Sequence, residues 1–240
     1  MRLAIVTGGS RGLGLALCEA LLARGYRVVE FSRSAPHPFS VRADLAHPLA
    51  SQHAISQAIK PFSKEPLSEL LVFSNAGTLS PIGAVASQSP ETAAANLNVN
   101  LTGPVLTFAA IVTTFQAMPC PKLIANISSG AASRGYAGWS LYCAAKAGME
   151  NFVRAFALEQ RQHEWPFVAV NVDPGVIDTD MQASIRAASA QDFPDVQRFI
   201  RRKEEGGLAN PRDVALRVLR IMASPALASG ERYDVADLGS

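Results

Sequence analysis

The sequence contains few of the residues that mark several classes of protein. Its three cysteines among 240 residues are Cys18, Cys120 and Cys143, an odd number without metal-ligand spacing. This pattern argues against a disulfide framework and against a structural metal site. A chain of this kind suits a reducing compartment, so we expect a cytoplasmic protein that binds no metal.

An excess of charge of one sign is also absent. The formal net charge is +2, and the basic cluster within residues 198–203 is followed at once by Glu204 and Glu205. We interpret this cluster as the solvated face of a helix, with nucleic-acid binding as the weaker alternative. We therefore expect no nucleic-acid partner.

Long apolar segments are missing as well. The opening "MRLAIVTGGS" has an apolar run too short for a secretory signal, and we expect no stretch to approach the roughly 20 apolar residues of a membrane helix. The sequence is nevertheless 48% hydrophobic and 18% charged, which is enough to bury a sizeable core. This length is common for one α/β domain, so we predict a single domain over residues 1–240 that has no membrane partner.

Short apolar runs alternate with segments of helical periodicity. Proline-containing caps mark two helix starts, at Ser89-Pro90-Glu91 and at Asn210-Pro211, and a helix over residues 12–24 stops at Gly25. Such alternation predicts an α/β fold of the Rossmann type, a doubly wound, mostly parallel sheet that binds ligands beyond the carboxyl ends of its strands. The predicted strands are residues 2–7, 26–31, 122–129, 167–175 and 232–235, together with one contained in residues 67–77 that ends at Asn75-Ala76-Gly77.

Glycines follow the first predicted strand in "TGGSRGLG", residues 7–14. Gly8, Gly12 and Gly14 would allow a tight turn and let the backbone approach a pyrophosphate at the positive end of a helix dipole. The spacing differs from the common dinucleotide pattern G-x-G-x-x-G, and a plain strand-to-helix turn is the alternative. Further along, Asp44 and Leu45, an acid and an apolar neighbour after a strand, could contact an adenine edge.

The end of the second predicted strand bears on which dinucleotide would bind. An acid at that place is typical of NAD binding because it bonds the ribose 2′-hydroxyl, but here Ser32 and Arg33 stand there. Arg33 and Arg11 would suit a 2′-phosphate, which predicts NADPH/NADP+. Two alternatives stay open. Both arginines could be ordinary surface residues, or a register shift of two could make Glu30 the acid, although we expect Glu30 to face elsewhere.

A tyrosine and a lysine lie one helical turn apart in "GWSLYCAAKAG", residues 138–148, so Tyr142 and Lys146 leave the same helix face. An ammonium about 5 Å away would favour a phenolate by roughly 3 kcal/mol, or about 2 pKa units. Tyr142 would then approach the range for proton transfer at neutral pH. The alternative is a chance pair in a helix built for close packing.

Two further polar sites strengthen this prediction. Ser128 and Ser129 end a predicted strand, and either hydroxyl could hold a substrate carbonyl, with a turn serine as the alternative. Asn100 lies in a helical stretch that continues into Gly103 and Pro104. Because proline has no N–H, the carbonyl of Asn100 loses its helical partner there and could hold a water, unless the Gly-Pro pair merely bends the helix.

Taken together, "TGGSRGLG", "SNAG", "NVNLTG", "NISS", "YCAAK" and "DPGVIDT" resemble, in order and spacing, the motifs of the short-chain dehydrogenase/reductase family over the whole chain. The resemblance implies an NADP-dependent oxidoreductase with a catalytic tetrad of Asn100, Ser129, Tyr142 and Lys146. Tyr142 would donate the proton, Ser129 would polarise the carbonyl and Asn100 would carry a water relay. Lys146 would bind the nicotinamide ribose and lower the phenol pKa.

The same resemblance implies the remaining contacts. One departure is Ser74, where asparagine is commoner. Another is the ending "RYDVADLGS", which lacks the frequent V-D-G-G. The implied cofactor-binding residues are Gly8, Ser10, Arg11, Gly12, Leu13, Gly14, Ser32, Arg33, Asp44, Leu45, Asn75, Ala76, Gly77, Tyr142, Lys146, Pro174, Gly175, Ile177 and Thr179.

Within the family, "GWSLYCAAKA", "PGVIDTDMQ" and "SGERYDV" are most similar to sepiapterin and benzil reductases, which reduce one carbonyl of a vicinal dicarbonyl. The likeness implies a substrate lid at about residues 180–209 and a substrate site of Ser129, Tyr142, Met181 and Asp234. Asp234 would anchor a pterin, unless it only bonds local backbone or Arg232. The helices near 90–118 and 140–160 imply a homodimer or homotetramer. A 3-oxoacyl thioester reductase and a non-catalytic NADP-binding regulator are the alternatives.

Overall fold

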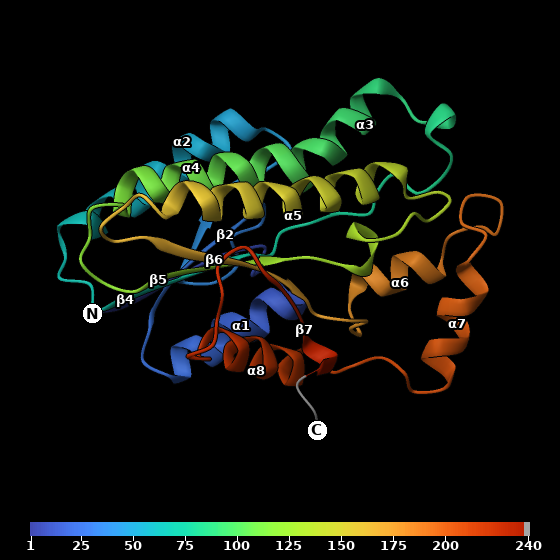
Figure 1. Ribbon diagram of the computed structural model, residues 1–240. Helices are drawn as coiled ribbons and strands as arrows, with labels where there is room; N and C mark the ends of the chain where they lie inside the picture. The colour runs from blue at the N-terminus through green and yellow to red at the C-terminus, as the bar shows by residue number, and fades with distance from the viewer. Residues whose placement is uncertain (238–240) are drawn as a thin grey trace.

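A single parallel sheet organises the chain. The structure, a computed structural model, describes residues 1–237, and residues 238–240 of the predicted domain lie outside the described part. Within residues 1–237, seven strands pair in the order β3-β2-β1-β4-β5-β6-β7, and every pairing is parallel (Figure 1). The strands are β1 (Arg2–Thr7), β2 (Arg27–Ser32), β3 (Ser40–Arg42), β4 (Glu69–Ser74), β5 (Lys122–Ile127), β6 (Phe167–Asp173) and β7 (Arg232–Asp234).

Helices cover both faces of the sheet, as Figure 1 shows. α1 and α8 lie on one face, and α2, α4 and α5 lie on the other. The helices are α1 (Gly12–Ala23), α2 (Pro48–Ile59), α3 (Pro90–Leu97), α4 (Gly103–Phe115), α5 (Ser140–Gln160), α6 (Asp180–Arg186), α7 (Val196–Glu204) and α8 (Pro211–Met222). Short turns are η1 (Lys60–Lys64), η2 (Val85–Ser87), η4 (Gly130–Ala132) and η5 (Val235–Asp237), which are 3₁₀, and η3 (Asn98–Thr102), which is a π-helix.

An apolar core lies on each side of the sheet, because successive side chains of a strand point to opposite faces. On β1, Leu3 and Ile5 belong to the cluster that includes Phe108 of α4, whereas Ala4 and Val6 belong to the cluster under α1 and α8. These four residues, which are consecutive within β1, are all fully buried. Burial on both faces explains why this strand is a continuous apolar run in the sequence.

The observed elements agree with the predicted doubly wound fold. The Ser89 hydroxyl accepts a hydrogen bond from the Thr92 N–H at 3.3 Å, and Asn210 Oδ1 accepts one from the Arg212 N–H at 2.8 Å, as the capping patterns predicted. The strand predicted within residues 67–77 is β4, which ends at Ser74, directly before Asn75. The strand β3 was not predicted. It has three partly exposed residues and pairs with β2 alone, so it leaves no apolar run in the sequence.

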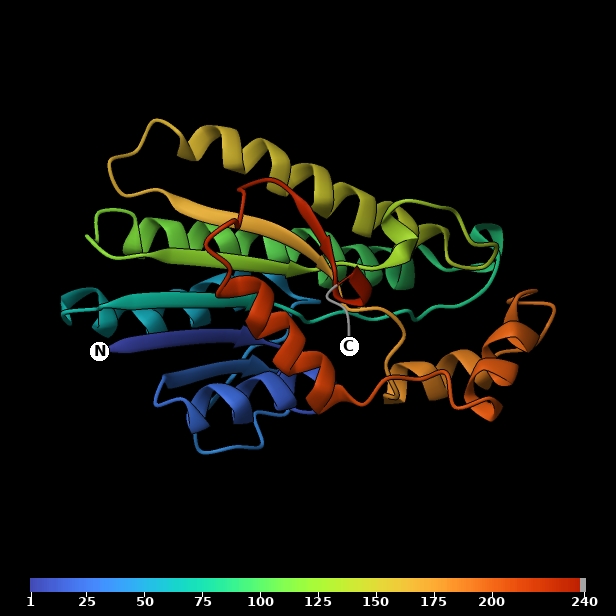
Figure 2. The same cartoon turned by 60° about the horizontal axis from the view of Figure 1, so that its bottom comes forward.

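The segment predicted as a substrate lid contains α6 and α7, which extend from the edge of the molecule beyond the carboxyl ends of the strands (Figure 2). Phe193, between these helices, stacks on Trp139 at the start of α5, with 4.5 Å between the ring centroids. Phe199 of α7 packs against both rings at 5.5 and 5.3 Å. The segment therefore has a small apolar core of its own.

One long helix corrects an expectation from the sequence. α3, η3 and α4 run together over Pro90–Phe115, which is long and apolar enough to cross a membrane by length and composition alone. The expectation that no stretch approaches this length is therefore wrong. Core helices of folded proteins meet the same criterion, and here α4 packs on α2 with Phe108 and Phe115 buried. We assign the helix to the core of the fold.

The loop after β1 is fixed to the end of β4 by the side chain of Asn75. Its Nδ2 donates hydrogen bonds to the carbonyls of Thr7 at 3.1 Å and of Gly8 at 3.0 Å. Gly14 of α1 approaches the same point so closely that a β-carbon there would lie 2.2 Å from the Gly8 carbonyl oxygen and 2.5 Å from Asn75 Nδ2. Only glycine fits at this position without displacing backbone.

We predict that Gly14→Ala destabilises the protein by about 1–3 kcal/mol, because the added methyl overpacks rigid backbone. Urea unfolding measures this free energy. Gly135→Ala is the matched control, since a β-carbon at Gly135 meets nothing within 4 Å. Equal stabilities for the two variants would contradict the close approach described above.

Candidate active site

A cavity of about 2260 Å³ opens where the strands end. Its walls come from the glycine loop after β1, the ends of β2, β4, β5 and β6, the start of α5 and the segment of α6 and α7. Drug-sized molecules occupy pockets of about 300–1,000 Å³, so this cavity could hold a dinucleotide together with a second molecule. Of the site residues predicted from the sequence, all line the cavity except Asn100 and Asp234.

Tyr142, Lys146 and Ser129 meet at one end of this cavity. Tyr142 and Lys146 lie one turn apart on α5, both are buried, and Lys146 Nζ lies 5.7 Å from the centre of the tyrosine ring. Lys146 Nζ donates a hydrogen bond to the Ile127 carbonyl at 2.7 Å, which ties α5 to the end of β5. Ser129 follows that end, and its Oγ accepts a hydrogen bond from the Ala131 N–H at 3.2 Å. A phenol, an ammonium and a hydroxyl thus share one site.

Burial controls the ionisation of these groups more than their mutual charge does. Burial raises the pKa of Tyr142 to about 12, while hydrogen bonding to Ser129 lowers it and the Asp173 carboxylate raises it. Burial also lowers the pKa of Lys146 to about 8, against the opposing effect of Asp173 and Glu150. The expectation that the pKa of Tyr142 falls toward neutral pH is therefore wrong for this structure, because burial raises it. The sequence indicated the spacing of the pair but not the desolvation of both groups.

Asn100 lies behind the cavity wall, on η3. Its Oδ1 accepts a hydrogen bond from the Thr78 N–H at 2.9 Å, and its Nδ2 donates one to the Thr78 carbonyl at 2.8 Å. A β-carbon on Gly77 would lie 3.2 Å from Asn100 Oδ1 and 3.9 Å from Lys146 Nζ, so these three residues converge. The π turn is the local cause, since the Gly103 N–H bonds the Asn98 carbonyl five residues back and Pro104 has no N–H to give to Asn100.

The opposite end of the cavity has the form of an anion cradle. Gly8 and Gly12 adopt positive φ angles of 70° and 58°, which glycine adopts without steric cost. α1 begins at Gly12, and no side chain caps its amino terminus. Its first N–H groups therefore face the loop with the positive end of the helix dipole. This geometry suits the pyrophosphate of a dinucleotide, and Asp44 and Leu45 line the adjoining wall.

Glu30 does not take the place of a ribose-binding acid. Its side chain is fully buried, with Oε1 accepting from the Gly9 N–H at 2.8 Å and Oε2 accepting from the Ser32 hydroxyl at 3.1 Å. Ser32 and Arg33 line the cavity instead. Arg11 also lines it, but its Nη1 forms an exposed ion pair with Asp180 at 2.8 Å.

The loop after β6 forms the wall that faces Tyr142. Asp173 Oδ1 accepts a hydrogen bond from the Gly175 N–H at 2.9 Å, which sets the turn that continues through Pro174. Thr179 approaches the glycine loop, because a β-carbon on Gly12 would lie 3.3 Å from its methyl group. Pro174, Gly175, Ile177 and Thr179 all line the cavity between its two ends.

An aromatic wall closes the side beyond Tyr142. Tyr136, Trp139 and Phe199 line it, with 4.8 Å between the ring centroids of Tyr136 and Trp139. Met181, predicted to contact substrate, and Ile185 line it from α6. This side of the cavity therefore offers aromatic and apolar side chains to a small molecule.

Asp234 stands apart from the other predicted substrate residues. It does not line the cavity, and its Oδ1 accepts from Arg232 Nη2 at 3.3 Å. Ser128 lines the cavity, but its hydroxyl donates to Glu150 Oε1 at 2.6 Å, which leaves Ser129 as the serine beside Tyr142. Of the two serines that the sequence left open, only Ser129 interacts with the phenol.

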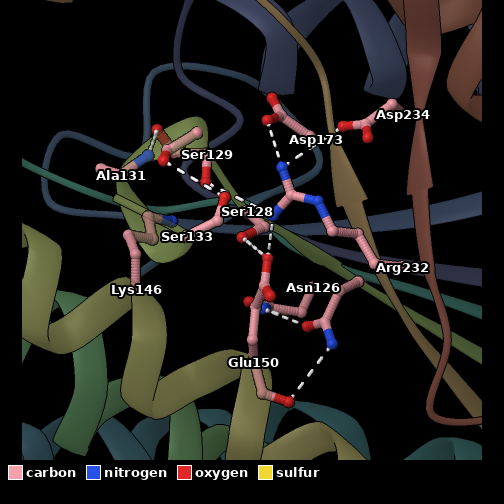
Figure 3. Close-up of polar contacts among 12 residues, drawn as sticks. Asn126, Ser128, Ser129, Ala131, Ser133, Lys146, Glu150, Asp173, Arg232 and Asp234 are labelled. Atoms are coloured by element: carbon pink, nitrogen blue, oxygen red, sulfur yellow. Dashed lines mark hydrogen bonds and ion pairs between the residues drawn. The ribbon is translucent and has the colours of Figure 1, made fainter. Parts of the chain in front are cut away.

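The sequence analysis assigned no role at the site to three charged residues, Glu150, Asp173 and Arg232. Figure 3 shows Arg232 of β7 between Asp173 and Asp234, with Glu150 of α5 reaching toward it and toward Ser128. The spacing of Glu150 gave one usable signal, because it lies one turn after Lys146 on the same helix face. The sequence named Arg232 only as a local partner of Asp234, a contact that the structure contains, and gave no signal for its contacts with Glu150 and Asp173, which depend on the sheet order. Among residues 1–237, no group of three or more histidine, cysteine, aspartate or glutamate side chains could hold a metal.

Known proteins resemble this chain over nearly its whole length. The family model for short chain dehydrogenases matches residues 2–190. The benzil reductase ((S)-benzoin forming) of Bacillus subtilis is 32% identical over 249 residues, covering 99% of each chain. The sepiapterin reductase of Xenopus tropicalis is 27% identical, covering 98% of this chain and 96% of its own. A 3-oxoacyl-[acyl-carrier protein] reductase of Brucella melitensis, solved in complex with NAD, superposes with a TM-score of 0.80 at 25% identity, covering 98% and 95% of the two chains.

The family match, the parallel sheet and the glycine loop agree with one another. Short-chain dehydrogenases use nicotinamide cofactors, and the cradle at the start of α1 fits the pyrophosphate of such a cofactor. The chain belongs to the short-chain dehydrogenase/reductase family of oxidoreductases.

Proposed function

We propose that this protein is an NADPH-dependent carbonyl reductase that reduces one ketone of a vicinal dicarbonyl. The observation that carries the proposal is the meeting of Tyr142, Ser129 and Lys146 at one end of a cavity whose other end is a glycine cradle. NADPH, when bound, supplies the hydride that reduces the carbonyl carbon. The substrate oxygen then needs a proton and a hydrogen-bond donor from the chain.

Tyr142 is the proton donor in this mechanism. A phenol pKa of about 12 keeps it protonated at neutral pH, as reduction requires. Ser129 donates a hydrogen bond to the substrate oxygen and polarises the carbonyl before the proton moves. Lys146, with a pKa of about 8, is mostly charged at neutral pH and holds the cofactor ribose. Asn100 fixes the Thr78 backbone and begins the water path that resupplies the proton.

The preference for NADPH rests on the residues around the end of β2. Glu30, the acid nearest to the expected ribose position, is buried and already bonded to Gly9 and Ser32. Arg33 is exposed on the cavity wall, where a guanidinium can bind a 2′-phosphate with two charge-assisted bonds. Arg11 can contribute after it leaves Asp180, a weak exposed pair.

The aromatic wall favours an aryl-substituted dicarbonyl over a 3-oxoacyl thioester. Tyr136, Trp139 and Phe199 offer ring faces to an aryl group, and benzil carries two such groups. A pterin remains the second candidate because a sepiapterin reductase is among the similar proteins. We further propose that the enzyme acts in the cytoplasm as a homodimer or homotetramer on a small-molecule carbonyl, with no nucleic-acid, membrane or metal partner.

Tyr142→Phe should lower kcat for benzil reduction by at least about a hundredfold, because it removes the general acid and keeps the ring. NADPH should still bind, which fluorescence titration measures. Tyr26→Phe is the matched control, because it also removes one tyrosine hydroxyl. That hydroxyl bonds Glu69 and lies outside the cavity. Turnover near wild type in Tyr142→Phe would contradict the assigned proton donor.

Arg33→Ala should raise the KM for NADPH about ten- to a hundredfold and leave the KM for NADH nearly unchanged, since it removes charge-assisted phosphate contacts. Arg11→Ala should have a smaller effect in the same direction, because Arg11 must first give up Asp180. Arg24→Ala, at the far end of α1, controls for loss of an exposed arginine. A wild-type preference for NADH would overturn the cofactor assignment.

Steady-state kinetics with benzil, sepiapterin and a 3-oxoacyl thioester should give the highest kcat/KM for benzil. Asp234→Ala should leave the ratio of benzil to sepiapterin efficiencies within about twofold of wild type, because Asp234 bonds Arg232 outside the cavity. A selective loss of sepiapterin reduction would instead assign Asp234 to a pterin site.

A further inference from the structure

Arg232 connects the three segments that build the catalytic end of the cavity. Its Nη1 donates to Glu150 Oε1 and lies 3.5 Å from the Ser129 carbonyl, and its Nη2 donates to Asp173 Oδ2 at 2.5 Å. Glu150 belongs to the helix of Tyr142 and Lys146, Ser129 follows β5, and Asp173 precedes the turn at Gly175. One guanidinium therefore bonds α5, the end of β5 and the end of β6 (Figure 3).

The carboxylates held by Arg232 are themselves bonded to catalytic segments. Glu150 is 5% exposed and accepts a hydrogen bond from the Ser128 hydroxyl, the residue directly before Ser129. Asp173 accepts the Gly175 N–H and lines the cavity. If Arg232 were lost, two largely buried carboxylates would lose their shared cation, and both segments would lose a fixed point.

Three carboxylates surround Arg232, each from a different element of the fold. Glu150 faces it from α5, Asp173 from β6 and Asp234 from β7, while Arg154 bonds only the outer oxygen of Glu150 at 3.0 Å. The same two carboxylates, Asp173 and Glu150, favour the charged form of Lys146. Arg232 therefore moderates the negative potential that acts on the catalytic end.

We propose that Arg232 is a positioning residue for carbonyl reduction, which fixes the Ser129 strand end and the Gly175 turn relative to Tyr142 and Lys146. The role rests on the proposed function, because it presupposes proton transfer at Tyr142. A guanidinium suits it better than an ammonium, since its fork bonds two carboxylates in a fixed plane.

The first test is the kinetics of Arg232→Gln with NADPH and benzil. We expect kcat to fall about ten- to a hundredfold, because small displacements of reacting groups are costly, while the NADPH dissociation constant changes little. The thermal midpoint should fall, because Glu150 and Asp173 lose their cation. Arg154→Gln is the matched control, since it removes the exposed partner of the same carboxylate and should change kcat by less than about twofold. Wild-type kcat in Arg232→Gln would overturn the proposal.

The second test needs no turnover. The chain has five lysines, so NMR titration of ¹³C-labelled lysine can follow Lys146 in the cofactor-free protein, with Lys146→Met to assign its signal. In Arg232→Gln the carboxylates lose their cation, and the Lys146 midpoint should move upward from about 8. Arg232→Lys keeps the positive charge but not the forked guanidinium. In this variant the Lys146 midpoint should stay near that of wild type, while kcat should lie between those of Arg232→Gln and wild type. An unmoved midpoint in Arg232→Gln would contradict the electrostatic part of the proposal.

These two tests separate the possible failures. If wild-type protein reduces none of the carbonyls, the proposed function fails, while the Lys146 titration still tests the action of Arg232. If neither Arg232 variant folds or binds NADPH, Arg232 acts on the fold as a whole, and the positioning role is overturned.

Discussion

The site depends on one constraint, the parallel pairing of β1, β2, β4, β5 and β6. Parallel strands all end at the same edge of a sheet, so the residues that follow them meet although they lie far apart in the sequence. The glycine loop, Asn75, Ser129 and Asp173 are each the continuation of a different strand. Helices on both faces bury the sheet, and this burial fixes the register on which the meeting point depends.

Desolvation is the second determinant, and it acts on the groups gathered at that edge. Tyr142, Lys146 and Glu150 leave water together because they lie on the buried face of α5, the face that also carries Met149 and Val153. Burial alone would neutralise Lys146 and keep the proton on Tyr142. Asp173 and Glu150 partly restore the lysine charge. The carboxylates behind the pair therefore favour the coexistence of acid and cation at neutral pH.

Much of this arrangement could be predicted from local sequence signals. The apolar runs, the glycine loop, the two helix caps and the Tyr-x-x-x-Lys spacing each depend on residues close together in the chain, and the fold that they indicate is the one observed. The edge strand β3 was missed because three partly exposed residues leave no apolar pattern. The contact of Arg232 with Glu150 was missed because a strand near the end of the chain meets Glu150 only through the sheet order, which no local pattern encodes. The phenol pKa was mispredicted because burial is a property of the packed protein.

The π turn at Asn98–Thr102 has a consequence for the evolution of this chain. A π turn holds one residue more than the α-helical turn it replaces, so deletion of a single residue there would restore a regular helix, except for the backbone bond that Pro104 cannot donate. The deletion would, however, change the rotation of the preceding helix about its axis. Each α-helical residue turns the chain by about 100°, so everything before the deletion would rotate by that angle relative to α4, and the Asn100 side chain could no longer hold both polar groups of Thr78. Insertions and deletions that surface loops tolerate should therefore be selected against within these five residues.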